Sequence, residues 1–262
     1  MSKLWEQMLL VPSVVRLTSR APKDPSAAWD GYWRGIRTTG RSGDVLWDSG
    51  SQTELEQYTD AVLGHFNPAL PVIDIGCGNG TNTRWLAGLF PRAIGIDVSV
   101  GAIALARREA AGLHNVEFLA MDATEPGAGE HLLESVGPAN VFVRGVFHVL
   151  KPDQQASLAT NLRTVVGNNG RVFLAETNFP GSSLAYLQEL GATRRSMPRQ
   201  LQRALENLPR PGHFGTQERH NTFPDSDWHL IADGPAHIEV TPMNANGHSQ
   251  HVPGYFALLA GA

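Results

Sequence analysis

From residue 70 onward, short apolar runs alternate with longer segments that carry apolar residues at helical spacing. Apolar runs of this length, bounded by polar or turn-forming residues, are typical of buried parallel strands. Five runs are predicted as strands: residues 72–75, 93–96, 116–120, 140–143 and 171–175. Strands and helices that alternate in this way predict a parallel sheet with right-handed crossover helices on both faces.

The helical segments also have recognisable ends. Ser99 precedes one of them as an N-cap, and Gly112 follows its last residue. Predicted helices cover residues 4–17, 51–66, 81–89, 99–111 and 152–166, the first of them broken by Pro12.

The C-terminal part follows a different pattern. Residues 223–232 predict a short helix, and residues 237–243 and 255–259 predict two strands joined without a helix. A hairpin of this kind leaves the penultimate strand parallel to the rest and makes the last strand antiparallel. The expected fold class is therefore α/β: a doubly wound, mostly parallel seven-stranded sheet with an antiparallel last strand, plus a helical cap.

These elements divide the chain into four parts. Residues 1–50 are expected to form N-terminal helices that act as a lid, and residues 51–176 a Rossmann-like cofactor-binding core. Residues 177–222 carry two short helical segments and are predicted to form a cap over the substrate. Residues 223–262 complete the sheet with the helix and the hairpin.

A glycine-rich turn follows the first predicted strand. Gly76, Gly78 and Gly80 alternate there, and the helical pattern starts at Thr81, so the turn brings backbone against a ligand at a helix N-terminus. The spacing differs from the dinucleotide-binding pattern, in which the third glycine comes one residue later. Asp74 would repel a pyrophosphate but could hold an ammonium group, which S-adenosylmethionine carries.

The stretch from Asp74 to Gly80, including Cys77, resembles motif I of the class I S-adenosylmethionine-dependent methyltransferases. The resemblance extends over residues 70–180. It implies S-adenosylmethionine as the cofactor, with S-adenosylhomocysteine as the product, and it agrees with the expected antiparallel last strand.

Ligands of open α/β sheets bind at the carboxyl ends of the strands. Asp97 and Val98 end the second strand, where a carboxylate can accept hydrogen bonds from both ribose hydroxyls. The resemblance implies that Asp122 and Ala123, after the third strand, meet the adenine. It also implies that Arg144 and Gly145, after the fourth, line the methionine end of the cofactor.

Two residues are candidates for catalysis. His148 belongs to an R-x-x-x-H stretch that resembles the one after the fourth strand of many small-molecule O-methyltransferases. A neutral imidazole can take a proton from a hydroxyl as it attacks. Glu176, after the fifth strand, could orient the substrate or act as the base. The alternatives are a core histidine and a strand-end acid bonded to backbone.

Aromatic and histidine residues outside the core supply further candidates. Tyr32, Trp33 and Trp47 precede the first strand and could cover the cofactor's sulfonium, which favours aromatic faces, or could simply pack in the core. Four histidines are candidate substrate contacts: His213 and His220 in the cap, and His248 and His251 in the C-terminal hairpin. The last two lack a nearby third ligand, so no metal site is predicted.

Composition limits the kinds of partner that we expect. The net charge is −4, whereas proteins that bind nucleic acid typically carry an excess of positive charge. The single cysteine suits a reducing compartment, and no early apolar run is long enough to span a bilayer. We expect a cytoplasmic protein, monomeric or homodimeric, without nucleic-acid or membrane partners.

The expected activity is base-assisted, in-line methyl transfer to a small, hydrophobic or aromatic molecule of secondary metabolism or detoxification. Oxygen is slightly favoured as the acceptor over nitrogen, sulfur or carbon. The alternatives are a protein of the same fold with repurposed chemistry, such as a cyclase or a non-catalytic binder, and an oxidoreductase on a Rossmann sheet.

Overall fold

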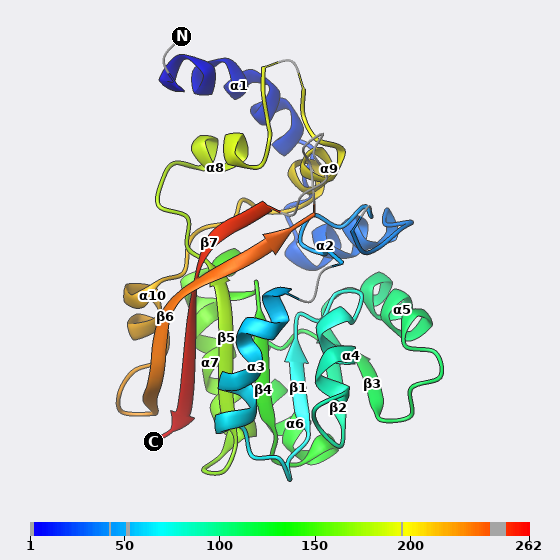
Figure 1. Ribbon diagram of the computed structural model, residues 1–262, viewed down its shortest axis with the longest axis vertical. Helices are drawn as coiled ribbons and strands as arrows, with labels where there is room; N and C mark the ends of the chain where they lie inside the picture. Colours follow the sequence, from blue (N-terminus) through cyan, green and yellow to red (C-terminus); the bar gives the residue numbers. More distant parts are fainter. Residues whose placement is uncertain (1–2, 42, 51–52, 195, 242–249) are drawn as a thin grey trace.

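A seven-stranded sheet forms the centre of the molecule in the computed structural model, which describes residues 3–41, 43–50, 53–194, 196–241 and 250–262. The strand order is β3-β2-β1-β4-β5-β7-β6 (Figure 1). The strands are β1 (Val72–Ile75), β2 (Ala93–Asp97), β3 (Val116–Ala120), β4 (Asn140–Arg144), β5 (Arg171–Thr177), β6 (Trp228–Val240) and β7 (Gln250–Gly261). Strands β1 to β5 pair in parallel, and β7 is antiparallel to both of its neighbours. The expected fold class is confirmed.

Helices cover both faces of the sheet, because the central strands bury apolar side chains on both sides. Val72 of β1 packs with residues of α3 (Thr53–His65) and α4 (Thr81–Ala87). Ile73 and Ile75, on the opposite face, pack with residues of α6 (Ala128–Val136) and α7 (Pro152–Val166). Helix α5 (Val100–Glu109) begins after Ser99, whose side chain accepts from the N–H of Ala102 as an N-cap.

The carboxyl ends of the strands are covered by segments from two distant parts of the chain (Figure 1). One part comprises α1 (Lys3–Thr18) and α2 (Pro25–Arg34), and the other comprises α8 (Ser183–Glu189) and α9 (Arg199–Asn207). Helix α9 contacts both α1 and α2, so the N-terminal helices and the cap form one layer. Among the described residues, no helix is both long and apolar enough to cross a bilayer.

Several predicted elements differ from the structure. The helix expected over residues 223–232 is wrong: α10 (Thr216–Thr222) ends earlier, and β6 begins at Trp228. Phe223 and Trp228 are buried in the same apolar cluster, so they anchor a turn instead of a helical face. The cap region therefore holds three short helices instead of two, and α6 was not predicted. Both strands of the hairpin begin earlier or extend further than expected, and residues 242–249 between them lie outside the described residues.

Candidate active site

The glycine-rich turn after β1 needs its glycines. Gly76, Gly78 and Gly80 have φ angles of 71°, 54° and 76°, in the left-handed region that side chains disfavour. A Cβ on Gly78 would lie 2.6 Å from the indole of Trp33, so the aromatic residue from α2 rests directly on the loop. The N–H groups of Gly76 and Cys77 donate to the carbonyl of Ile96, at 2.7 and 2.9 Å. The loop is thus fixed to β2.

Asp74 lies beneath this loop. Its side chain is 1% exposed, and its Oδ2 accepts a 2.6 Å hydrogen bond from the Thr83 hydroxyl of α4. Burial raises the pKa of the carboxyl to about 7. Asp74 does not line the neighbouring cavity, so its visible role is to hold the loop and the start of α4 together. A contact with the ammonium group, direct or through water, stays a prediction.

A cavity of about 230 Å³ opens at the carboxyl ends of the strands. Nine of the predicted cofactor-binding residues line it: Trp33, Trp47, Gly76, Asp97, Val98, Asp122, Ala123, Arg144 and Gly145. Trp29, which the sequence analysis did not select, lines it as well. A smaller polar cavity of about 50 Å³ shares Trp47, Gly76 and Arg144 with the first and is lined by Cys77 and Gly78.

Two carboxylates of the main cavity are held by backbone N–H groups. Asp97 accepts from Ser99 at 2.9 Å and from Gly78 at 3.0 Å. Burial raises its pKa to about 6. The Oδ1 of Asp122 accepts from the N–H and the hydroxyl of Thr124, at 2.8 and 2.7 Å, and its Oδ2 has no partner within the described structure. One acceptor atom of Asp122 therefore remains available at the cavity wall.

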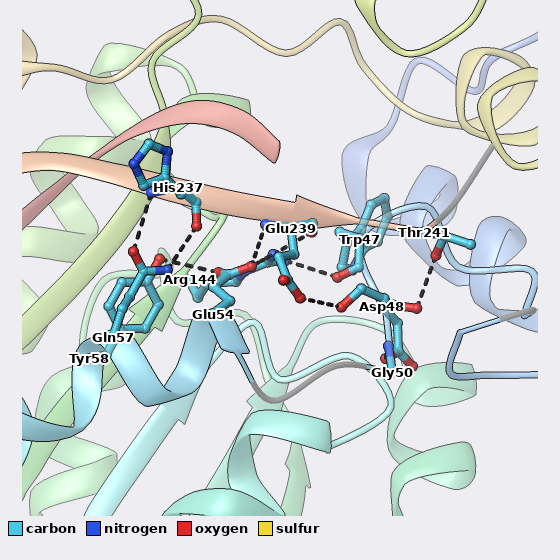
Figure 2. A network of polar contacts seen from close by, with 11 residues as sticks. Trp47, Asp48, Gly50, Glu54, Gln57, Tyr58, Arg144, His237, Glu239 and Thr241 are labelled. Carbon is cyan, nitrogen blue, oxygen red and sulfur yellow. Dashed lines mark hydrogen bonds and ion pairs between the residues drawn. The ribbon is translucent and has the colours of Figure 1, made fainter. Parts of the chain in front are cut away.

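Arg144 joins four segments through its guanidinium group (Figure 2). It makes a two-pronged ion pair with Glu54 of α3, at 2.7 and 2.6 Å, in which the side chains are 8% and 6% exposed. The same guanidinium donates to the carbonyl of Trp47 at 3.2 Å and to that of Glu239 in β6 at 3.0 Å. One of its five N–H groups is left for a ligand. The sequence analysis missed Glu54 and Glu239, because only the folded chain brings them to Arg144.

Hydrogen bonds on two sides hold residues 45–50, the segment before α3, in place beside the site. The hydroxyl of Thr241 donates to the carbonyl of Asp48, and the hydroxyl of Ser49 donates to Glu239, at 2.9 and 2.8 Å. On the other side, the amide of Asn79 in the glycine loop donates to Asp48 at 2.8 Å. Residues 45–50 therefore form a wall between the end of β6 and the glycine loop.

The three predicted aromatic residues have different positions. Trp33 and Trp47 face the cavity, whereas Tyr32 is 0% exposed and stacks on Trp47 at a centroid distance of 5.2 Å. The backbone N–H of Leu46 donates to the Tyr32 hydroxyl at 3.4 Å, and burial raises the pKa of this phenol well above its usual range. Tyr32 thus packs behind the cavity wall, which was the alternative left open for it.

His148 and Glu176 form a closely bonded pair beside the cavity. The distance from His148 Nδ1 to Glu176 Oε2 is 2.6 Å. Glu176, at the end of β5, is 0% exposed and also accepts from the N–H groups of Val146, Phe147 and His148, at 2.9, 2.9 and 3.2 Å. It thereby holds the short helical turn η1 (Phe147–Val149). His148 lines the cavity, whereas Glu176 lies behind it.

Of the other predicted histidines, those that the structure describes do not line this cavity. His213 is exposed and pairs with Glu218 at 3.1 Å, and His220 is exposed on α10. His251 is exposed on β7 beside His237, and His248 lies outside the described residues. The cap contributes apolar side chains to the cavity instead: Leu187, Leu190, Leu201, Leu205 and Leu208.

The chain is similar to known methyltransferases. Residues 72–170 match the model of a methyltransferase domain. A solved structure of an S-adenosylmethionine-dependent methyltransferase from Anabaena variabilis is 26% identical, with 93% of this chain and 97% of that chain covered and a TM-score of 0.77. A magnesium protoporphyrin IX methyltransferase from Synechocystis with bound S-adenosylhomocysteine shares the fold, at 16% identity, 80% coverage of each chain and a TM-score of 0.52.

A curated relative gives a shorter match. The tRNA/tmRNA (uracil-C(5))-methyltransferase of Campylobacter curvus is 25% identical over 167 residues, which is 62% of this chain. The chain spans about half of that relative's length, since the match covers 46% of it. Together, the matched domain, the shared architecture and the glycine loop at the end of β1 support a class I S-adenosylmethionine-dependent methyltransferase.

Proposed function

We propose that this protein binds S-adenosylmethionine in the main cavity and methylates a small, largely apolar molecule, with oxygen as the favoured acceptor atom. One observation carries the proposal. A single cavity is lined by the glycine loop, by Asp97 and Asp122, and by a histidine that a buried glutamate orients.

The free polar groups fit the parts of this cofactor. Asp97 would accept from the ribose hydroxyls, and the unused Oδ2 of Asp122 would accept from the adenine amino group. Arg144 lines both cavities, so its remaining N–H would suit the amino-carboxylate end of the cofactor. Trp33 and Trp47 offer aromatic faces to a sulfonium. When bound, the cofactor supplies an electrophilic methyl group.

The hydrogen-bond pattern of His148 supports its role as the base. A carboxylate can only accept, so Nδ1 carries the proton that bonds Glu176. Nε2 then holds a lone pair and can take a proton from an attacking hydroxyl. Glu176 is a positioning residue in this scheme, because three backbone N–H groups and the imidazole surround it behind the cavity.

The acceptor class follows from the cap side of the cavity. Leucines of α8 and α9, together with Ile238 and Val240 at the end of β6, make this side apolar. An apolar or aromatic acceptor is stabilised there by burial, at roughly 25 cal/mol per Å² of apolar surface. The net charge of −4 favours such a molecule over a nucleic acid, although one relative is named for tRNA.

Two alternative functions would use the same cofactor. Acceptors with nitrogen, sulfur or carbon would use the same cavity, and a cyclase or a non-catalytic binder would use it without methyl transfer. We also propose a cytoplasmic location, which the single, buried cysteine suits.

The test combines binding and turnover. Calorimetry should detect S-adenosylhomocysteine binding, and radiolabelled S-adenosylmethionine should label hydroxylated aromatic acceptors from a panel that also includes amines and thiols. His148→Ala should lose turnover and keep S-adenosylhomocysteine affinity, and Glu176→Gln should shift the pH profile of kcat. If the wild-type protein does not bind S-adenosylhomocysteine, the proposed function is wrong.

A further inference from the structure

The opening of the main cavity is marked by its exposed lining residues. Three of the residues that line the cavity in the described structure belong to the exposed class: Pro25, Gly76 and Arg210. Pro25 belongs to α2 and Arg210 to the segment after α9, so the cavity meets solvent between the N-terminal helices and the cap. A molecule that enters between these two segments passes Arg210.

Arg210 carries an uncompensated charge within the described structure, where it has no ion-pair partner. A neighbouring arginine in the cap differs: Arg203 pairs with Asp44 at 3.2 Å. The acids that line the cavity, Asp97 and Asp122, lie at the ends of β2 and β3 and accept from backbone N–H groups there. No carboxylate on the cap side of the lining neutralises this guanidinium.

The backbone of Arg210 lies close to the segment that carries the base. The N–H of Gly212 donates to the carbonyl of His148 at 2.7 Å, and the N–H of Phe214 donates to the carbonyl of Thr177 at 3.0 Å. Two residues of chain span at most about 7 Å, so the backbone of Arg210 stays within that distance of Gly212. One small molecule can therefore contact both Arg210 and His148.

We propose that Arg210 binds an anionic group of the acceptor, so that the acceptor combines an apolar body with a carboxylate, sulfonate or phosphate. The inference rests on the proposed function, because it places the acceptor in this cavity. The planar guanidinium can bond two oxygens of such a group at once.

The test uses two fluorescent probes that share their rings and differ in one charge. Anilinonaphthalene sulfonate is anionic, and phenylnaphthylamine is its neutral counterpart. The wild-type protein should bind the sulfonate more tightly, and added salt should weaken that preference. Arg210→Ala should lower affinity for the sulfonate by about fivefold to tenfold. Its affinity for the neutral probe should stay unchanged.

Two controls make the result specific. Arg199→Ala removes another exposed arginine of the cap that does not line the cavity, and it should change neither affinity. Calorimetry with S-adenosylhomocysteine should give equal affinity for the wild type and Arg210→Ala. The proposal is overturned if Arg210→Ala lowers affinity for both probes equally, or if Arg199→Ala lowers affinity for the sulfonate as much as Arg210→Ala does. It is also overturned if the wild type does not bind the sulfonate.

The two proposals fail in different ways. A loss of S-adenosylhomocysteine affinity in Arg210→Ala would assign the residue to the cofactor and overturn its role toward the acceptor. A wild type that binds the sulfonate through Arg210 but does not bind S-adenosylhomocysteine would refute the proposed function alone.

Discussion

The ion pair between Glu54 and Arg144 gives the sharpest stability prediction. Glu54→Gln keeps the shape of the side chain and removes its charge. The carboxylate accepts from two guanidinium nitrogens, from the Tyr58 hydroxyl at 3.2 Å and from the N–H of Glu239 at 2.6 Å. An amide can accept only through its single oxygen, and its NH₂ group then faces donors. The variant therefore leaves Arg144 buried without its counter-charge.

The expected loss of stability is large because both partners of the ion pair are almost fully buried. Removing one partner of a buried ion pair destabilises a protein by about 3–5 kcal/mol. In a domain of this size, 1 kcal/mol corresponds to roughly 2–4 °C in Tm, so we expect Glu54→Gln to lower Tm by about 6–20 °C. Thermal melts followed by circular dichroism, with urea titrations at one temperature, measure this change.

Glu56→Gln is the matched control. Glu56 lies two residues along the same helix, also in its first turn, and is exposed, so its variant should melt within about 2 °C of the wild type. The double variant Glu54→Gln/Arg144→Gln should be less destabilised than the sum of the single variants by about 1 kcal/mol or more. Equal melting of Glu54→Gln and Glu56→Gln would refute the reasoning.

Two further predictions concern the loop and the buried acid. Gly78→Ala should weaken S-adenosylhomocysteine binding by about tenfold or more, because the added Cβ meets Trp33 at 2.6 Å and the φ angle is 54°; Gly64→Ala, whose Cβ meets nothing within 4 Å, should bind like the wild type. The raised pKa of Asp74, about 7, means that the folded protein holds a proton which the unfolded chain releases near pH 4, so this group's contribution to stability falls as the pH rises toward 7. In urea titrations between pH 5 and pH 8, the free energy of unfolding of Asp74→Asn should therefore fall less with pH than that of the wild type. An equal dependence on pH in the two proteins would contradict the raised pKa of Asp74.

The core of the fold could be predicted from the sequence, because burial on both faces makes the central strands short and apolar. The predicted first and third strands and the helix at 152–166 have the observed bounds. Asp97 and Asp122 were found by their position at strand ends, and the structure places both on the cavity wall. The local pattern of apolar residues predicts these elements, and the rule that ligands of open α/β sheets bind at the carboxyl ends of the strands predicts the two acids.

Long-range polar contacts could not be predicted in this way. Glu54 and Arg144 are 90 positions apart, and no local pattern links them. The candidate histidines of the cap and the hairpin were selected by residue type and topology, but those that the structure describes lie outside the cavity. The helix expected at residues 223–232 was wrong because tertiary packing of Phe223 and Trp228 overrides local helical preference.

The anchoring of the cap has a consequence for how specificity can diverge. The chain leaves the sheet after Thr177 and returns through Gly212 and Phe214, which are bonded to the carbonyls of His148 and Thr177. The returning end is thus bonded both to the turn that carries the histidine and to the strand end where the excursion begins. A different sequence grafted between these ties would alter which molecules are accepted and leave the proton-accepting group in place. This layout separates the choice of acceptor from the chemistry, so each can evolve without the other.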